Sequence, residues 1–245
     1  MNQRFLYGLL LLGLLFACDE PTHRMEGYAV HGIDVSHYQK QIDWPRIAEQ
    51  DIHFAFVKAT EGLTYQDSLF CRNWDGMAAA QIKRGAYHFF RPSVSAYDQA
   101  RNYMHWVNME AGDLAPVLDV EVLDGVSKVT LIAQMHTWLY LVEINYGIKP
   151  VIYTNLKFYN RYLAGHFKDY PLWIARYNTR TPTLACGREW DFWQYGSKGR
   201  LEGIEGNIDF NVFRGSPEAL EQYCVQPTVV LSDDQHLASI PHNYR

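Results

Sequence analysis

Short apolar runs with the length of β-strands alternate with helical patterns from Val30 almost to the end of this 245-residue chain. Strands that alternate with helices pair in parallel through right-handed crossover connections. The pattern therefore predicts an α/β fold built around a parallel sheet. The strand candidates are Gly32–Ser36, Phe54–Lys58, Arg84–Phe89, Ala115–Glu121, Pro150–Thr154, Leu172–Arg176, Asp191–Gln194 and Gly206–Phe210.

Eight strands in so short a chain favour a closed barrel over an open sheet. A complete (β/α)8 barrel, a TIM-like barrel, takes about 250 residues, so several outer helices must be truncated or missing, above all after Leu172. The chain offers five helical patterns and no internal repeat. They are Trp44–Gln50, Phe70–Gln81, Ser95–Glu110, Ser127–Tyr146 and Leu156–Leu163.

The run Leu118-Asp119-Val120-Glu121 places two carboxyl groups at the end of one strand candidate. Residues two apart in a strand point to the same face, so Asp119 and Glu121 project together. Two neighbouring acids do not both ionise freely, and one of them retains its proton nearer to neutral pH. An acid beside a carboxylate is what cleavage of a glycosidic bond requires. A strand end whose acids only meet solvent or a lysine is the alternative.

Two further acids belong to the first and last strand candidates. If the barrel closes, these strands are neighbours, so Asp34 and Asp209 come together near Asp119 and Glu121. Each alone is equally consistent with a structural role. Four acids at one barrel mouth are hard to explain by fold maintenance, because unpaired buried carboxylates cost several kcal/mol.

The chain begins with a pattern typical of an export signal. Arg4 precedes an apolar run, Phe5 to Ala17, that is too short for a spanning helix. The run ends at Leu15-Phe16-Ala17-Cys18, which resembles a lipobox, so we expect a signal peptide at 1–17 and lipidation of Cys18; an ordinary secretory signal is the alternative. We expect a tether at 18–29, the barrel at 30–224 and a C-terminal tail at 225–245. The protein is then held at a membrane in the cell envelope, or otherwise secreted.

Composition narrows the classes of partner. A formal net charge of −5 and the absence of a basic patch argue against nucleic acid. No cysteine pair or histidine cluster has metal-ligand spacing, so we expect no metal and no cofactor.

Besides Cys18 there are three cysteines, and we expect Cys186 to pair with Cys224 because both lie in the C-terminal part. We expect a monomer.

Eight stretches together resemble glycoside hydrolase family 25, the lysozymes that cleave peptidoglycan between N-acetylmuramic acid and N-acetylglucosamine. They follow the order of the family and cover nearly all of residues 31–214. The resemblance implies an irregular, flattened barrel that lacks some helices. The stretches are GIDVSHYQKQIDW (32–44), FAFVKATEG (54–62), RGAYHFF (84–90), APVLDVE (115–121), PVIYTN (150–155), PLWIARY (171–177), DFWQY (191–195) and GIEGNIDFNVF (203–213).

The resemblance also implies roles for single residues. Glu121 would be the general acid and then the base that activates water. Asp119 would steady the acetamido group of the substrate or the charge at the anomeric carbon. Asp34 and Asp209 would complete the acidic cluster. The residues expected to line the cleaved linkage are Lys58, Tyr65, Tyr87 and Tyr153, with Trp173 and Gln194 equally consistent with a packed aromatic and a strand-end amide.

The family outcome is retention of the anomeric configuration. Spacing within the strand does not separate retaining from inverting carboxyl pairs, and the resemblance favours attack by the substrate's own N-acetyl carbonyl. Two alternatives stay open: a hydrolase of another N-acetylhexosamine polymer on the same fold, and a catalytically inactive glycan-binding lipoprotein.

Overall fold

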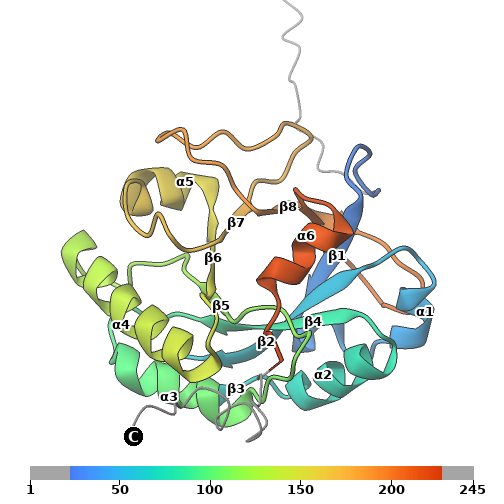
Figure 1. Ribbon diagram of the computed structural model, residues 1–245, viewed down its shortest axis with the longest axis horizontal. Coiled ribbons are helices and arrows are strands. Elements are labelled where there is room, and N and C mark those ends of the chain that lie inside the picture. The colour runs from blue at the N-terminus through green and yellow to red at the C-terminus, as the bar shows by residue number, and fades with distance from the viewer. Residues whose placement is uncertain (1–22, 228–245) are drawn as a thin grey trace, which may run out of the picture.

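The computed structural model describes residues 23–227, and within them eight strands close into a barrel (Figure 1). β1 pairs with both β2 and β9, which closes the ring. A short strand, β3 (Tyr65–Gln66), forms a hairpin with β2 outside the ring. The barrel strands are β1 (Val30–Val35), β2 (Phe54–Glu61), β4 (Lys83–Phe89), β5 (Val117–Asp119), β6 (Val151–Asn155), β7 (Leu172–Ala175), β8 (Phe192–Gly199) and β9 (Ile208–Phe213).

The predicted barrel is confirmed, but the prediction that every strand is parallel is wrong for the last one. β9 runs antiparallel to both β8 and β1, whereas the other neighbouring pairs of the ring are parallel. Only residues 200–207 connect β8 to β9, and they contain glycines with positive φ at 203 and 206. A connection this short permits an antiparallel return but not a helical crossover.

The three longest helices lie along one side of the barrel, at the lower edge of the view in Figure 1. The hydroxyl oxygens of Ser95 and Ser127 accept backbone N–H groups at the starts of α3 and α4, and Gly147 ends α4 in the left-handed conformation. The ends differ from the predicted ones by a few residues. The longer helices are α1 (Trp44–Ala48), α2 (Phe70–Ala79), α3 (Ala96–Trp106) and α4 (Lys128–Tyr146).

Short helical turns account for the remaining helical residues of the described part. The predicted helix at 156–163 is α5 (Leu156–Phe158) followed by the π-helical turn η2 (Tyr159–Leu163). η1 (His37–Gln39) follows β1. Near the C-terminus come α6 (Pro217–Leu220) and η3 (Glu221–Tyr223).

No helix follows β7 or β8 within the described residues, as the shortage of chain predicts. The segment at 23–29 packs on the outside of the barrel, against the apolar cluster that includes Trp190 and Trp193. Tyr28 packs against Trp190 and Trp193, each with ring centroids 6.2 Å apart. The Met25 amide donates to the Tyr195 hydroxyl at 3.2 Å. Part of the predicted tether is therefore attached to the barrel.

Aromatic rings fill the inside of the barrel. Phe54, Phe56 and Phe192 pack against one another with ring centroids 5.5–5.6 Å apart. The rings take up the space opposite glycines: a Cβ on Gly32 or Gly85 would approach a phenylalanine ring within 2.4–2.5 Å. This interior is a packed core, so a ligand has access only at the ends of the barrel.

The predicted Cys186–Cys224 disulfide is wrong: Cys71, Cys186 and Cys224 are all free. Cys224 belongs to the apolar cluster inside the barrel, here called the inner core, which also contains Phe54, Phe56 and Phe192. Its thiol donates to the Leu220 carbonyl at 3.6 Å. Cys186 is exposed in the loop after β7 and lies 3.4 Å from the Tyr159 hydroxyl. Burial raises the pKa of the Cys224 thiol to about 11.

Three predictions lie outside the described residues: the signal peptide at 1–17, lipidation of Cys18, and the tail beyond residue 227. Between residues 23 and 227, no helix combines the length and the apolar character needed to cross a bilayer.

Candidate active site

The inner face of the barrel changes from apolar to polar along its strands. On β1, Val30 belongs to the inner core, and Asp34 follows on the same face. On β5, Val117 belongs to that core and Asp119 follows two positions later. The same alternation turns Lys58 inward on β2. The ends of the parallel strands therefore direct polar side chains into one mouth.

At this mouth lies a cleft of about 270 Å³. The structure brings together all of the predicted site residues except Tyr65. The predicted residues that line the cleft are Asp34, Lys58, Tyr87, Asp119, Glu121, Tyr153, Trp173, Gln194 and Asp209.

Asp34 is held by two amide donors. Gln194 Nε2 donates to Asp34 Oδ2 at 2.8 Å, and Asn211 Nδ2 donates to the same oxygen at 2.7 Å. Asp209 occupies the position opposite Asp34 in the β1–β9 ladder. Burial, followed by the charge of Asp209, raises the pKa of Asp34 well above its ordinary value, although the two amide donors oppose the rise.

Gln194 is fixed from both ends of its amide. Its Oε1 accepts the hydroxyls of Tyr153 at 2.7 Å and of Tyr177 at 3.0 Å, which leaves Nε2 to donate to the acid. The Trp173 indole donates to Asn211 Oδ1 at 2.8 Å and orients that amide in the same way. Trp173 and Gln194 are each only 2% exposed, so both line the cleft as buried, hydrogen-bonded groups.

Asp119 and Glu121 form the second acidic pair. Asp119 is 5% exposed, and its buried Oδ1 has no hydrogen-bond partner among the described residues. Burial, followed by the charge of Glu121, raises the pKa of Asp119 well above its ordinary value. Burial also raises the pKa of Glu121, against side-chain hydrogen bonds with Asn155 and Asp119. The pair therefore retains a proton at a pH where free carboxylates are ionised.

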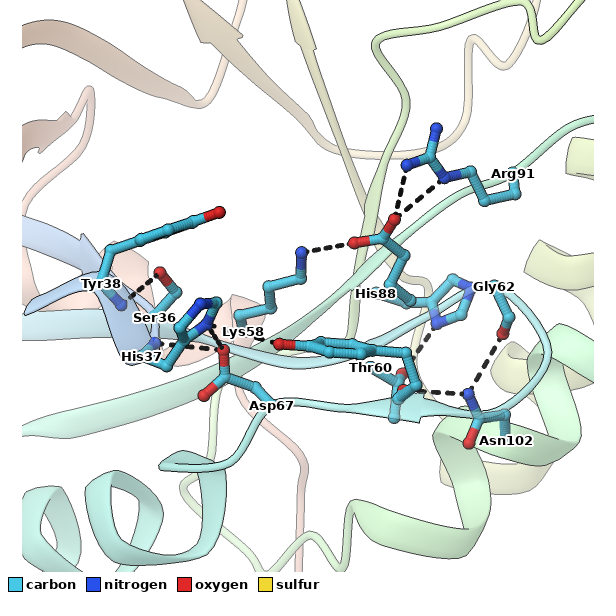
Figure 2. A network of polar contacts seen from close by, with 12 residues as sticks. Ser36, His37, Tyr38, Lys58, Thr60, Gly62, Asp67, His88, Arg91 and Asn102 are labelled. Atoms are coloured by element: carbon cyan, nitrogen blue, oxygen red, sulfur yellow. Dashed lines mark hydrogen bonds and ion pairs between the residues drawn. The ribbon is translucent and has the colours of Figure 1, made fainter. Parts of the chain in front are cut away.

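Lys58 reaches the cleft as one member of a chain of charges, and Figure 2 shows the part of it from Lys58 to Arg91. Its ammonium donates to Glu61 Oε2 at 2.7 Å. Glu61 Oε1 accepts Nε and Nη2 of Arg91 at 3.0 and 2.6 Å. Arg91 Nη1 reaches Asp124 Oδ1 at 3.3 Å. Lys58 is thus neutralised and held in place by groups from three successive strand ends.

Tyr65 is the predicted site residue that the structure places outside the cleft lining. It lies on β3, is 42% exposed, and its hydroxyl is 3.4 Å from His37 Nδ1. Its ring lies 5.4 Å from the Lys58 ammonium. Tyr65 therefore supports the rim of the site, beside residues that do line it.

The barrel has counterparts among known proteins. The sequence profile of glycosyl hydrolases family 25 matches residues 33–204, which is more than half of the chain. The chain belongs to glycosyl hydrolase family 25. The resemblance seen in the sequence is thereby confirmed, and the protein is a glycoside hydrolase.

Relatives of this family 25 chain include proteins from several bacteria. YegX of Escherichia coli K12, an uncharacterized protein, is 44% identical over 80% of this chain and 74% of its own length. Lysozyme M1 of Streptomyces globisporus is 35% identical over 78% of this chain and 70% of its own length. A family 25 glycosyl hydrolase from Bacillus anthracis superposes with a TM-score of 0.78 at 33% identity, covering 82% of this chain and 96% of that one.

Some residues of the family 25 cleft escape the sequence argument. Phe89 lies two positions after Tyr87 on β4, so strand alternation alone could have found it. Tyr38 and Tyr177 lie in segments that follow β1 and β7, whose direction no strand period determines. The lining residues that were not predicted are Val35, Ser36, Tyr38, Gln39, Phe89 and Tyr177.

Proposed function

We propose that the protein is a muramidase that hydrolyses the β-1,4 bond between N-acetylmuramic acid and N-acetylglucosamine in peptidoglycan. The observation that carries the proposal is a pair of acids with raised pKa, the buried Asp119 and the half-buried Glu121, in the cleft of a family 25 barrel. Relatives named lysozyme support the substrate class.

Glu121 is proposed as the general acid that protonates the leaving oxygen. A general acid must retain its proton at the working pH, and burial raises the pKa of Glu121 in that sense. Glu121 is less buried than Asp119, so it can reach a glycosidic oxygen in the cleft. After departure of the leaving group, the same carboxylate takes a proton from water, which gives retention over two steps.

Asp119 is proposed to orient the acetamido group of the substrate. Its unpartnered, buried Oδ1 lacks a donor that an acetamido N–H supplies. With the amide N–H held there, the N-acetyl carbonyl attacks the anomeric carbon, and Asp119 offsets the charge of the resulting ring. Asp34 and Asp209 are proposed to hold the proton balance of the cluster and to bind sugar hydroxyls.

The other predicted substrate contacts fall into two groups according to the role proposed for each. Lys58, Tyr87 and Tyr153 line the cleft and are proposed to surround the cleaved linkage. Trp173 and Gln194 are proposed to act on substrate through Asp34, because their polar atoms are engaged in its hydrogen-bond network. A direct contact of Tyr65 with the substrate stays a prediction.

The test is digestion of purified cell walls, followed by borohydride reduction and mass spectrometry of the products. Reduced muramic acid at the new ends supports the proposal, and reduced glucosamine there contradicts it. Preferential cleavage of chitin oligomers would show altered specificity. Binding to cell walls without any release of product would show a glycan-binding protein without activity.

The site of action is proposed to be the cell envelope, with the monomer anchored through lipidated Cys18. Met25 and Tyr28 contact the barrel, so the proposed anchor at Cys18 is separated from the first of these contacts by six residues of sequence. Labelling of the wild-type protein by an alkyne fatty acid, with loss of the label and of the membrane fraction in Cys18→Ser, tests this. Equal labelling of both proteins would contradict it.

A further inference from the structure

Tyr38 has an unusual environment for a large aromatic side chain. It lines the cleft, yet it is 77% exposed. It lies in η1, the turn that directly follows β1 and Asp34. An aromatic ring that is largely exposed to solvent on a cleft wall offers a flat apolar face that a ligand can cover.

The turn that carries Tyr38 is held rigidly. The Tyr38 amide donates to Ser36 Oγ at 3.3 Å, and the Ser36 amide donates to Gln39 Oε1 at 2.9 Å, so the turn has a complete capping box. Gln39 Nε2 also donates to the Asn207 carbonyl at 3.4 Å. An exposed ring on a fixed turn loses little conformational entropy when a ligand packs on it.

Asp67 also holds this turn, through its contacts with His37. Its side chain is fully buried, and its Oδ2 accepts the His37 amide at 3.1 Å and lies 2.7 Å from His37 Nδ1. Its Oδ1 accepts the Leu69 amide at 3.0 Å. The oriented His37 ring packs against the ring of Tyr38, with centroids 4.2 Å apart, and Figure 2 shows Tyr38 extending from the turn in the direction of Lys58.

The charge around Tyr38 selects the chemistry of the ligand. The cation that shares the cleft with it, Lys58, is paired with Glu61 at 2.7 Å, so no free positive charge of that side chain is offered to an anion. A flat apolar ring face beside hydrogen-bonding groups suits an uncharged pyranose, whose C–H face stacks on an aromatic ring.

We propose that Tyr38 is a stacking platform for one pyranose ring of the glycan at the β1 side of the cleft, with Asp67 as its positioning residue. The proposal rests on the proposed function, because it assumes that a glycan occupies this cleft. Tyr38 lies on the turn after β1, whereas the acidic pair lies on and just after β5, and a ring that only stacks on a sugar moves no proton. The contact therefore concerns the affinity for the glycan and not the chemical step.

The test uses soluble peptide-free glycan strands and four variants. Tyr38→Ala should raise KM about fivefold to tenfold, the value of one aromatic contact, with kcat within about twofold of wild type. Tyr38→Trp should retain the wild-type KM, because it preserves the ring face. Tyr97→Ala is the matched control: Tyr97 is 53% exposed on α3 and lies outside the cleft lining, so KM should not change. Asp67→Asn replaces an acceptor oxygen with a donor and should raise KM in the same direction.

The outcomes separate the two proposals. If wild type does not cleave the strands, the proposed function fails whatever Tyr38 does. If wild type cleaves them and Tyr38→Ala has an unchanged KM, the platform is refuted while the muramidase stands. A loss confined to kcat in Tyr38→Ala also refutes it. An unchanged KM in a folded Asp67→Asn variant, checked by its Tm, removes Asp67 from the positioning role. Binding of the strands in a Glu121→Gln background, with and without Tyr38→Ala, repeats the comparison without turnover.

Discussion

Asp209 on β9 lies directly opposite Asp34 on β1, in an antiparallel ladder that joins the first and last strands of the barrel. β9 runs in the opposite direction to the other barrel strands, so its start lies at the mouth where those strands end. Asp209 is the second residue of β9 and therefore lies at this mouth. Burial is the largest cause that raises the pKa of Asp34, and the charge of Asp209 is the next.

Removal of the Asp209 charge should therefore lower the pKa of Asp34. Asp209→Asn removes the charge of Asp209, which is the second largest cause of the raised pKa after burial. The substitution keeps the size of the side chain. Titration of carboxyl carbons by NMR in ¹³C-aspartate-labelled protein should show the Asp34 midpoint at lower pH than in wild type. Asp98→Asn, an exposed site on α3, should leave it in place. A midpoint that stays or rises in Asp209→Asn would contradict the coupling.

Glu121→Gln should abolish nearly all hydrolysis and leave binding of peptidoglycan intact. The amide keeps the shape of the side chain but cannot deliver a proton, and general acid catalysis contributes about 10²- to 10⁴-fold. Dye release from labelled cell walls measures the activity, and co-sedimentation with walls measures binding. Glu26→Gln, at an exposed glutamate before the barrel, is the matched control and should behave as wild type. Substantial turnover by Glu121→Gln would remove Glu121 from the acid role.

Much of this site follows from strand alternation. Once Val30 and Val117 are inside the barrel, Asp34 and Asp119 must face the same interior, and their positions at strand ends put them at the mouth. The neighbourhood of Asp34 and Asp209 followed from barrel closure alone, so it survived the wrong expectation that β9 is parallel. The direction of β9 depends on the length of the 200–207 connection, which the apolar pattern does not encode.

The sequence pattern does not predict the position of site residues in loops and turns, nor the hydrogen-bond partners of polar side chains. Tyr38 reaches the cleft because a capping box and Asp67 bend the turn after β1, and that geometry depends on a buried carboxylate from another segment. Asn211 lies two residues from Asp209 on β9, but nothing in the sequence indicates that the amide of a strand residue donates to Asp34. The predicted Cys186–Cys224 disulfide is wrong because a shared place in the C-terminal part of the sequence carries no information on where the two side chains point.

The alkaline limit of activity should depend on Asn155. As the proposed acid, Glu121 is active while protonated, so activity falls as pH rises through its pKa, which burial raises. The Asn155 side chain opposes that rise by hydrogen bonding to Glu121, and its Oδ1 also caps α5 by accepting the Phe158 amide at 2.9 Å. Asn155→Asp retains a cap but replaces the donor with a negative charge, so the pKa of Glu121 should rise further.

The measurement is the pH dependence of kcat on soluble glycan strands. The alkaline limb should move to higher pH in Asn155→Asp and stay in place in Asn108→Asp, an exposed control site. A shift of the limb to lower pH in Asn155→Asp would show that another group carries the proton.

His88 should make the fold sensitive to acid. It is fully buried on β4, with Nδ1 2.7 Å from Thr60 Oγ1 and Nε2 3.1 Å from Gln99 Oε1, and burial lowers its pKa to about 4. The unfolded chain binds a proton at an ordinary histidine pKa of about 6.5, so between these values the unfolded state binds more protons. Stability from this group is complete above about pH 6.5 and falls as the pH drops toward 4, by about 3 kcal/mol.

Urea unfolding at a series of pH values between 7 and 4 isolates this contribution. His88→Gln should be less stable than wild type at pH 7, because it loses part of the buried network, but its free energy of unfolding should decline less on acidification. His105→Gln, at an exposed histidine on α3, should retain the wild-type decline. The raised pKa values of Asp34, Asp119 and Glu121 act in the opposite sense in all three proteins, so the difference between His88→Gln and wild type removes their effect. If the free energy of unfolding declined equally with pH in wild type and His88→Gln, the pKa of His88 in the folded state would be that of an ordinary histidine.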